Sequence, residues 1–185
     1  FGQCKILLPM IATLADLRDV RKVIDEEMKA LARTAPIEVG IMVEVPSAAL
    51  ISRTLAAEAD FLSVGTNDLA QYTLAIDRVN ARLAKQLDPF HPAVLRLIQL
   101  AAEGAKAHGR WVGVCGSLAS FPLAAPVLIG LGVTELSATS GSIAGIKAMV
   151  RTLDMNTCKA AADAALALES GEAVRRMLAK SWPEA

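Results

Sequence analysis

Two acidic residues stand where short apolar segments of the chain end. Glu44 directly follows the apolar run 41–43, and Asp68 comes shortly after a run that closes at Val64. An isolated buried carboxylate is very costly, so a carboxylate at the end of a buried strand needs a cation, a proton or another partner. Magnesium typically takes one or two protein carboxylates and fills its octahedron with water and substrate oxygens. We therefore expect a divalent metal at Glu44 and Asp68. The alternatives are an arginine partner for Glu44 and a helix cap at Asp68.

The turn that carries Asp68 reads Gly-Thr-Asn-Asp-Leu over residues 65–69 and joins an apolar run to a helix-like segment. Free backbone N–H groups at a helix N-terminus can receive phosphate oxygens, although Thr66, Asn67 and Asp68 could each be ordinary N-caps. Arg78 follows ten residues after Asp68. A guanidinium suits bidentate capture of phosphate or carboxylate, but the spacing alone equally allows Arg78 to form an ordinary ion pair.

Cys115 stands at the end of the apolar run 112–115, directly before a glycine. A thiol is largely protonated at neutral pH, so it can donate a proton as readily as it can attack. Cys4 and Cys158 have no such setting, and we expect them to act as small hydrophobic residues. Three cysteines without CxxC spacing argue against a disulfide scaffold or a zinc site and fit a reducing cytoplasm.

The composition excludes two broad classes of partner. The 185-residue chain is 54% hydrophobic, and its 19 basic residues balance 19 acidic ones. No bulk charge therefore draws it to nucleic acid or to an anionic membrane, and any phosphate must be met by a local cluster. No apolar segment approaches the roughly 18 uninterrupted residues of a membrane span. We expect a single soluble, cytoplasmic domain over residues 1–185.

Short apolar runs alternate with helix-like segments along the whole chain. The runs, expected to be strands, are 6–11, 39–45, 61–64, 112–115 and a weak fifth at 136–138. The first expected helix has Thr13 as its N-cap, with Asp16 three residues on, and ends by Pro36. Its apolar stripe comprises Leu17, Val20, Ile24, Met28 and Leu31. Further helices are expected from Ser47, over Pro92–His108, after Pro122, from Ser142, and once or twice in the last 30 residues.

Strands that are apolar throughout are typical of a parallel sheet covered by helices, and alternation of strands and helices predicts right-handed βαβ units. A complete βα barrel takes about 250 residues, so five units in 185 residues indicate an α/β parallel barrel without its first strands. An open doubly wound sheet is the structural alternative. In a barrel the carboxyl ends of the strands carry the chemistry, and those ends hold Glu44, Asn67 with Asp68, Cys115, and the pair 139–140.

Three segments together are similar to a known family. Met-Val-Glu-Val-Pro around Glu44, SVGTNDLAQYTLAIDR over 63–78 and GVCGSLAS over 113–120 resemble the C-terminal domain of Enzyme I of the bacterial phosphoenolpyruvate:sugar phosphotransferase system. Pyruvate phosphate dikinase and phosphoenolpyruvate synthase are more distant relatives. The resemblance extends from Ile6 to the last helices. It implies a (βα)8 TIM-type barrel that binds phosphoenolpyruvate and Mg²⁺ and forms a homodimer.

The resemblance also implies a role for each candidate residue. Glu44 and Asp68 match the metal ligands of the family, and Asn67 and Arg78 match groups that bind the phosphate. Cys115 matches the acid that protonates the enolpyruvate carbon to give pyruvate. The phosphoryl group would pass to a histidine on a separate N-terminal domain and then to a phosphocarrier protein of the full-length parent.

Some features of the family have no match in this sequence. Neither His91 nor His108 has the setting of the phosphorylated histidine, and two substrate-binding arginines of the family belong to earlier barrel strands. Ser117 replaces the glutamate found after the Cys-Gly pair in many sugar-type proteins, which, with the LIGLGVTELS stretch (128–137), favours the fused multiphosphoryl transfer proteins. We therefore expect this piece to be inactive in phosphoryl transfer by itself.

Two other functions are compatible with the same residues. A Mg²⁺-dependent aldolase or lyase of the broader phosphoenolpyruvate/pyruvate barrel group also places a Glu and an Asp on the metal, although a proton donor at Cys115 fits the phosphotransferase better. A non-catalytic dimerisation or sensing module would keep the site for binding only. In each case a barrel that lacks strands exposes unpaired edges, so we expect self-association.

Overall fold

A computed structural model describes residues 4–183 of the chain. Its centre is a parallel sheet of five strands in the order β1-β2-β3-β4-β5. The strands are β1 (Lys5–Leu8), β2 (Glu38–Val43), β3 (Leu62–Gly65), β4 (Val112–Cys115) and β5 (Glu135–Leu136). Neighbours along the chain are thus neighbours in the sheet, and all carboxyl ends lie at one edge.

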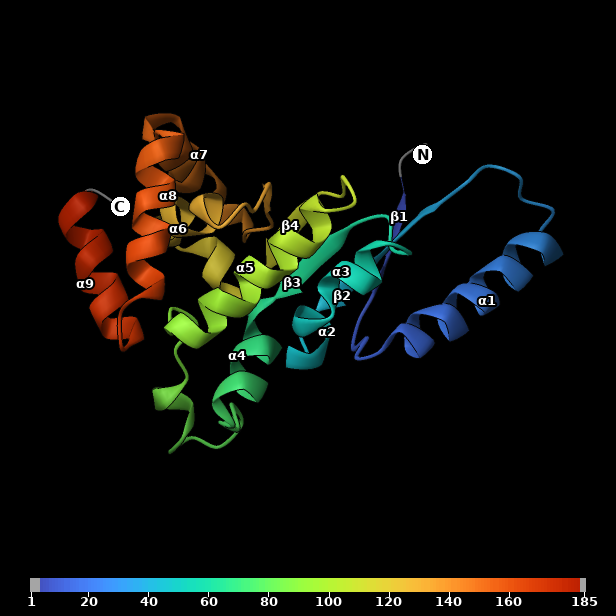
Figure 1. The fold of residues 1–185 in the computed structure, drawn as a ribbon, viewed down its shortest axis with the longest axis horizontal. Coiled ribbons are helices and arrows are strands. Elements are labelled where there is room, and N and C mark those ends of the chain that lie inside the picture. The colour runs from blue at the N-terminus through green and yellow to red at the C-terminus, as the bar shows by residue number, and fades with distance from the viewer. Residues whose placement is uncertain (1–3, 184–185) are drawn as a thin grey trace.

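The strand order decides between the two architectures that the sequence allows. In a doubly wound sheet the order reverses at a switch point, whereas here each new strand adds beside the previous one throughout. The doubly wound alternative is therefore wrong, and the sheet is consistent with part of a βα barrel. Helices α2 (Pro46–Leu50), α3 (Ser52–Ala56) and α5 (Pro92–Lys106) lie together over one face of the sheet (Figure 1).

The remaining helices follow the alternation that the sequence predicts. They are α1 (Leu14–Ala30), α4 (Thr66–Leu74), α6 (Ala125–Gly130), α7 (Ile143–Thr152), α8 (Met155–Leu166) and α9 (Gly171–Ser181). Four short 3-10 turns are η1 (Ala84–Gln86), η2 (Ser117–Ser120), η3 (Pro122–Ala124) and η4 (Ser140–Ser142). In the described part of the last 30 residues, the expected closing helices are α8 and α9.

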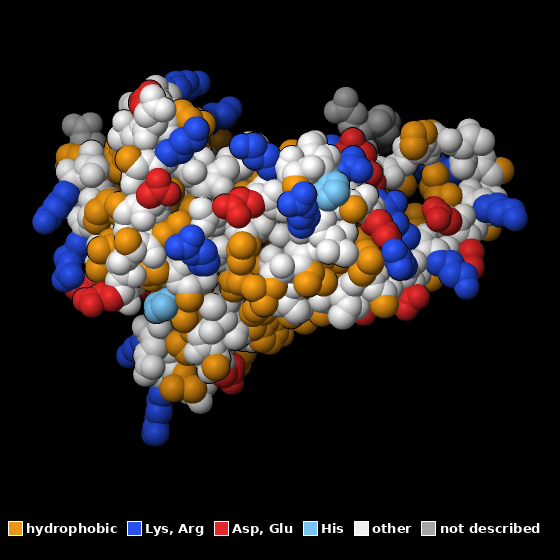
Figure 2. Space-filling view, viewed as in Figure 1, with side chains coloured by type: hydrophobic (Ala, Val, Ile, Leu, Met, Phe, Trp, Pro, Cys, Tyr) orange, Lys and Arg blue, Asp and Glu red, His pale blue; other side chains and the backbone are white. Residues whose placement is uncertain are grey.

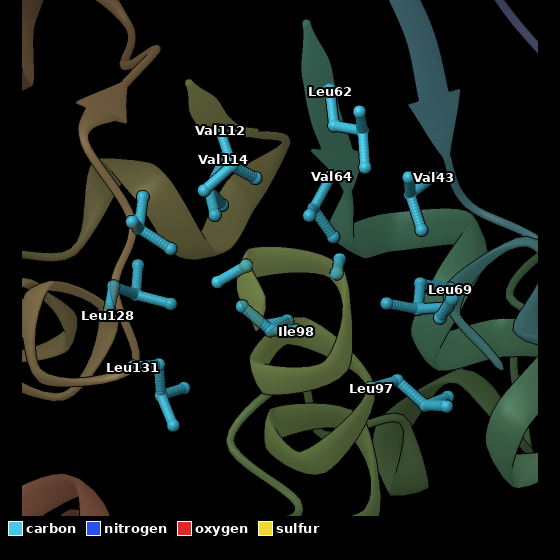
Figure 3. Packing of buried hydrophobic residues seen from close by; sticks show 14 of the residues in the cluster. Val43, Leu62, Val64, Leu69, Leu97, Ile98, Val112, Val114, Leu128 and Leu131 are labelled. Carbon is cyan, nitrogen blue, oxygen red and sulfur yellow. The ribbon is translucent and has the colours of Figure 1, made fainter. Parts of the chain in front are cut away.

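The core lies between the sheet and α5, with α6 beside it. Leu62 and Val64 of β3, Val114 of β4 and Ile98 of α5 are fully buried and belong to one hydrophobic cluster (Figure 3). Alternate residues of each strand face the helices, as the pleat requires. The other strand face includes Met42 of β2, Ser63 of β3 and Gly113 of β4 and leads to the end of the sheet where Glu44 and Cys115 lie.

Helix α1 starts as predicted but packs less than predicted. The Thr13 side chain accepts the N–H of Asp16, and the Asp16 carboxylate accepts the N–H of Thr13, which is a complete capping box. Of the apolar stripe, Leu17 alone is fully buried, whereas Leu31 is 68% exposed. Figure 1 shows why, because α1 stands at one end of the molecule, away from the other helices. The helix also ends at Ala30, well before Pro36.

Several strand and helix boundaries differ from those expected. Strand β1 stops at Leu8 because Pro9 follows, without an N–H to donate, and Met10 turns the chain with a φ of 57°. The helix from Ser47 is broken at Ile51 into α2 and α3. Strand β5 keeps only two residues and lies one position earlier than the expected 136–138.

The surface of the view in Figure 2 carries both signs of charge in alternation, in line with the equal numbers of basic and acidic residues. No large field of one sign covers this face. Among residues 4–183, no helix has both the length and the apolar composition needed to cross a bilayer.

Candidate active site

Glu44 follows the last residue of β2 and is buried, with 4% of its surface exposed. Its Oε1 accepts the backbone N–H of Met10 at 2.7 Å, which ties the turn after β1 to the end of β2. None of the ion pairs among residues 4–183 involves Glu44. The arginine partner considered from the sequence is therefore not found in the described part of the chain.

Gly65 makes room for Glu44 on the neighbouring strand. The register pairs Val43 with Val64, so Glu44 comes level with Gly65 at the next step. A Cβ at Gly65 would lie 2.9 Å from Glu44 Oε2 and 3.0 Å from Met42 Sδ. A larger residue would push the carboxylate out of its place, so the glycine is needed for the close packing of the two strand ends.

Asp68 lies in the first turn of α4 and forms an ion pair with Arg78, with 2.9 Å between Oδ1 and an Nη nitrogen. The Asp68 side chain is 25% exposed and that of Arg78 is 41% exposed. The Arg78 backbone N–H is accepted by the side-chain oxygen of Gln71 at 3.2 Å, which anchors the loop after α4. The fold thus brings together two residues that the sequence placed in one site, and it also gives Asp68 an ordinary cationic partner.

Asn67 contacts the loop that follows β4. Its Oδ1 accepts the backbone N–H of Ser117 at 3.1 Å and the Ser117 hydroxyl at 2.8 Å. Asn67 is partly buried and Ser117 is exposed. Two strand ends that are 50 residues apart in the chain are joined at this point.

Cys115 ends β4 beside the same turn and is partly buried. The Ser63 hydroxyl donates to its Sγ at 3.5 Å, and the thiol donates to the carbonyl of Val64 at 3.5 Å. The buried hydroxyl of Thr66 donates to the Cys115 carbonyl at 3.1 Å. The thiol is therefore held at the edge of the sheet by contacts from β3, with its proton directed to an oxygen acceptor.

Gly116 allows the chain to turn directly after β4. Its φ is 99°, a region that L-residues rarely adopt. A Cβ there would lie 2.7 Å from Thr66 Oγ1 and 3.3 Å from the side-chain carbonyl of Asn67. Both the conformation and the close approach therefore require glycine between Cys115 and Ser117.

The hydrogen-bond partners of the site were missed from the sequence. Ser63 bonds from β3 to Cys115, Thr66 bonds from α4 to Cys115, and Ser117 bonds from the turn after β4 to Asn67. The sequence gives one hint of these contacts, since Ser63 is a polar residue in an apolar strand. Thr139 and its neighbour Ser140 lie at the same edge, where the Thr139 N–H donates to the Ser120 hydroxyl at 3.0 Å. No hydrogen bond among residues 4–183 joins them to the residues described above.

The chemistry of the donors decides which metal the site could hold. Among the described residues no group of three His, Cys, Asp or Glu side chains gathers in one place. A structural or catalytic zinc site, which needs three or four protein ligands, is therefore not formed by these residues. Two carboxylates, one of them buried without a cationic partner, suit a magnesium ion that takes its other ligands from water and substrate.

The family can now be assigned by comparison. The family model described as "PEP-utilising enzyme, PEP-binding domain" matches residues 1–155. The chain belongs to this family. The match includes Glu44, Asp68, Arg78 and Cys115 and ends at the start of α8. The resemblance seen in the sequence is thereby confirmed at the level of the PEP-utilising enzymes.

Two named relatives show the range of similarity. The multiphosphoryl transfer protein of Rhodobacter capsulatus is 48% identical over 174 residues, which cover 94% of this chain and 21% of the relative. The phosphoenolpyruvate-protein phosphotransferase of Mycoplasma genitalium is 40% identical over 178 residues, which cover 96% of this chain and 31% of the relative. The chain thus spans about a fifth to a third of the length of the curated relatives it matches.

A solved structure supports the fold of the domain. A citrate lyase from Burkholderia xenovorans superposes with a TM-score of 0.62 at 21% identity, covering all of this chain and 66% of the lyase. At this identity the likeness concerns the fold alone. It does not favour lyase chemistry over phosphoryl transfer.

Proposed function

We propose that the chain is the phosphoenolpyruvate-binding part of a phosphoenolpyruvate–protein phosphotransferase, built on a (βα)8 barrel in the full-length parent. The phosphoryl group of phosphoenolpyruvate passes to a histidine on a separate domain, and pyruvate is released. One observation carries the proposal: the carboxyl ends of β2, β3 and β4 lie side by side, which places Glu44, the 66–68 turn and Cys115 at one end of the sheet. Hydrogen bonds join the 66–68 turn to Cys115 and to Ser117. Family membership and the named relatives support it.

The phosphate end of the substrate is assigned to Asn67 and Arg78. The Asn67 carboxamide keeps its Nδ2 donors for a ligand, because its oxygen is bound to Ser117. Arg78 presents a guanidinium beside Asp68 at the start of α4. Planar N–H donors of this kind match the geometry of phosphoryl oxygens. Their hydrogen bonds stabilise the negative charge of the transferred group.

The metal is assigned to Glu44 and Asp68. Mg²⁺ bound there would neutralise charge on the phosphoryl and enolpyruvate oxygens of the substrate. Glu44 is prepared for this role because Met10 fixes its Oε1 while Oε2 lies against Gly65. Asp68 also forms an ion pair with Arg78, so the Arg78 guanidinium and the proposed Mg²⁺ would lie near the same end of the substrate.

The carbon chemistry is assigned to Cys115. After the phosphoryl group leaves, the Sγ–H of Cys115 donates its proton to the methylene carbon of enolpyruvate, which forms the methyl group of pyruvate and leaves a thiolate. The Ser63 hydroxyl donates to the same sulfur at 3.5 Å and stabilises that thiolate. A proton donor to enolpyruvate at Cys115 fits the phosphotransferase better than an aldolase that condenses pyruvate with an aldehyde.

The same proposal covers partners of the full-length parent. A histidine-bearing N-terminal domain and a phosphocarrier protein receive the phosphoryl group, and the parent is a cytoplasmic homodimer. Two relatives carry the name multiphosphoryl transfer protein, which supports a fused parent.

Calorimetric titration with phosphoenolpyruvate tests the proposal. We expect binding that strengthens with Mg²⁺, and we expect Glu44→Gln to abolish the gain from Mg²⁺ while its carboxamide oxygen still accepts the Met10 N–H. Glu172→Gln, on the exposed surface of α9, is the matched control and should bind like the unsubstituted chain. Cys115→Ala should bind phosphoenolpyruvate with unchanged affinity.

Two results would contradict the proposal. Binding of phosphoenolpyruvate that is indifferent to Mg²⁺ in every variant would refute the metal assignment. Condensation of pyruvate with an aldehyde, catalysed by the chain and lost in Glu44→Gln, would assign it to the aldolases instead.

A further inference from the structure

One side-chain oxygen in the first turn of α4 accepts two hydrogen bonds from the loop after β4. Asn67 Oδ1 receives both the backbone N–H and the hydroxyl of Ser117, at 3.1 Å and 2.8 Å. Ser117 is exposed to solvent, so its hydroxyl could have been satisfied by water. It lies instead against Asn67, a residue of the candidate site.

These bonds fix which way the Asn67 carboxamide points. A backbone N–H can only donate, so the atom that accepts it must be the oxygen of the carboxamide and not its nitrogen. The Ser117 hydroxyl donates to the same oxygen and holds it in place. The Nδ2 group, with two donors, is consequently turned away from the β4 loop and left for another acceptor.

The position of Ser117 is itself fixed by its neighbours. Gly116 adopts a φ of 99°, and a Cβ at this position would lie 3.3 Å from the side-chain carbonyl of Asn67. Thr66, fully buried, donates its hydroxyl to the Cys115 carbonyl at 3.1 Å and so binds the loop to the turn that carries Asn67. Ser117 therefore reaches Asn67 from a rigid support rather than from a free loop.

We propose that Ser117 is a positioning residue that orients the Asn67 carboxamide so that its Nδ2 donates to a phosphoryl oxygen of the substrate. This inference rests on the proposed function, since it names the group that prepares Asn67 for the phosphate. Ser117 makes no contact with the substrate. It acts through Asn67, and its removal leaves the carboxamide held by the backbone N–H alone.

Nuclear magnetic resonance tests the link without any substrate. The Asn67 side-chain amide gives one pair of ¹H–¹⁵N signals, identified by its loss in Asn67→Ala. We expect the heteronuclear Overhauser effect of this nitrogen to fall in Ser117→Ala, which reports a more mobile carboxamide, and to recover in Ser117→Thr, which restores a hydroxyl. Ser120→Ala removes a hydroxyl from the same loop that bonds Thr139 and not Asn67, so it should leave the signal unchanged. An unchanged signal in Ser117→Ala would overturn the inference.

Titration with phosphoenolpyruvate and Mg²⁺ then measures the consequence. A neutral side-chain hydrogen bond is modest, so we expect Ser117→Ala to weaken binding by about three- to tenfold, with Ser117→Thr close to the unsubstituted chain. In the Asn67→Ala background Ser117→Ala should have no further effect, because the residue through which it acts is gone. An equal loss in both backgrounds would overturn the inference and place Ser117 directly on the substrate.

The two arms separate failure of this inference from failure of the proposed function. A chain that binds no phosphoenolpyruvate in any variant refutes the proposed function, while the resonance data still decide whether Ser117 orients Asn67. A chain that binds phosphoenolpyruvate with Mg²⁺ and ignores Ser117→Ala refutes the inference alone.

Discussion

The three cysteines of the chain lie in three different environments. Cys4 is exposed, Cys115 is partly buried at the carboxyl end of β4, and Cys158 is buried in α8. Burial, followed by the nearby charge of Asp154, raises the pKa of the Cys158 thiol. Because the thiolate is the reactive form, the three thiols should differ in their reaction with alkylating reagents.

At the residue scale we predict that Cys4 is alkylated first, that Cys115 follows and is protected by phosphoenolpyruvate with Mg²⁺, and that Cys158 reacts only after unfolding. Mass spectrometry of peptides after timed alkylation measures each rate. Cys115→Ala identifies the protected signal. Protection of Cys4 instead of Cys115 would contradict the placement of the substrate at the β4 edge.

Glu44, Asn67, Asp68 and Cys115 could be found from the sequence because each lies at or shortly after the end of an apolar strand. Glu44 and Cys115 occupy such ends by position alone, and the structure places both at one edge of the sheet. Their partners could not be found in this way. Thr66 bonds to Cys115, and Ser117 bonds to Asn67, each across about 50 residues of chain. No local pattern of residues specifies a contact between segments so far apart in the sequence.

At the element scale, α6 and α8 approach each other closely at Gly130. A Cβ on Gly130 would lie 2.1 Å from the carbonyl oxygen of Cys158, so backbone would have to move. We predict that Gly130→Ala lowers the free energy of unfolding by roughly 1–3 kcal/mol, as overpacking usually does. Urea unfolding followed by circular dichroism measures the change. Gly141→Ala, where a Cβ meets nothing within 4 Å, is the control, and equal losses in both variants would contradict the packing argument.

The start of α8 gives a prediction of pH dependence. Asp154 is its N-cap and accepts the N–H groups of Asn156 and Thr157. The hydrogen bond from the Thr157 backbone is the main reason that the pKa of Asp154 is lowered, and burial opposes it. Since the folded pKa lies below the unfolded value, this stabilisation is complete above the unfolded pKa and is lost as the pH falls through the folded one.

We predict that the thermal stabilities of the unsubstituted chain and of the Asp154→Asn variant differ most at neutral pH and become similar in acid. The asparagine can still accept both N–H groups, so only the contribution of the charge is removed. Thermal unfolding at a series of pH values from neutral to acidic measures the difference. A difference that grows as the pH falls would contradict the assigned sign.

Sequence patterns predicted the elements best where local signals were strong. The capping box at Thr13 and the proline at the start of α5 set helix starts correctly. The sequence patterns failed where tertiary packing sets the bounds of an element. The break at Ile51 between α2 and α3 and the two-residue length of β5 depend on how each segment fits against its neighbours, which composition does not encode.

At the scale of the whole molecule, the sheet ends in two strands that have a neighbour on one side only within residues 4–183. These are β1 and β5, and the four-residue β1 is paired with β2 on one side, so the backbone groups on its other side have no strand partner among residues 4–183. Unpaired strand edges are templates for pairing with another chain. We predict association that increases with protein concentration and responds weakly to salt, since backbone hydrogen bonds rather than charges drive it. Sedimentation velocity over a wide range of concentration measures it, and a species that stays monomeric throughout would contradict it.

The strand order has a consequence for synthesis of the protein. Each strand after β1 pairs with the strand made just before it, so its first partner has already left the ribosome when it emerges. The sheet can therefore grow by one strand at a time as the chain emerges. The turn after β3 that carries Asn67 is then made before the loop after β4 that carries Ser117. The bond between Asn67 and Ser117 would then be among the later contacts to form, when β4 docks and closes the edge of the nascent sheet.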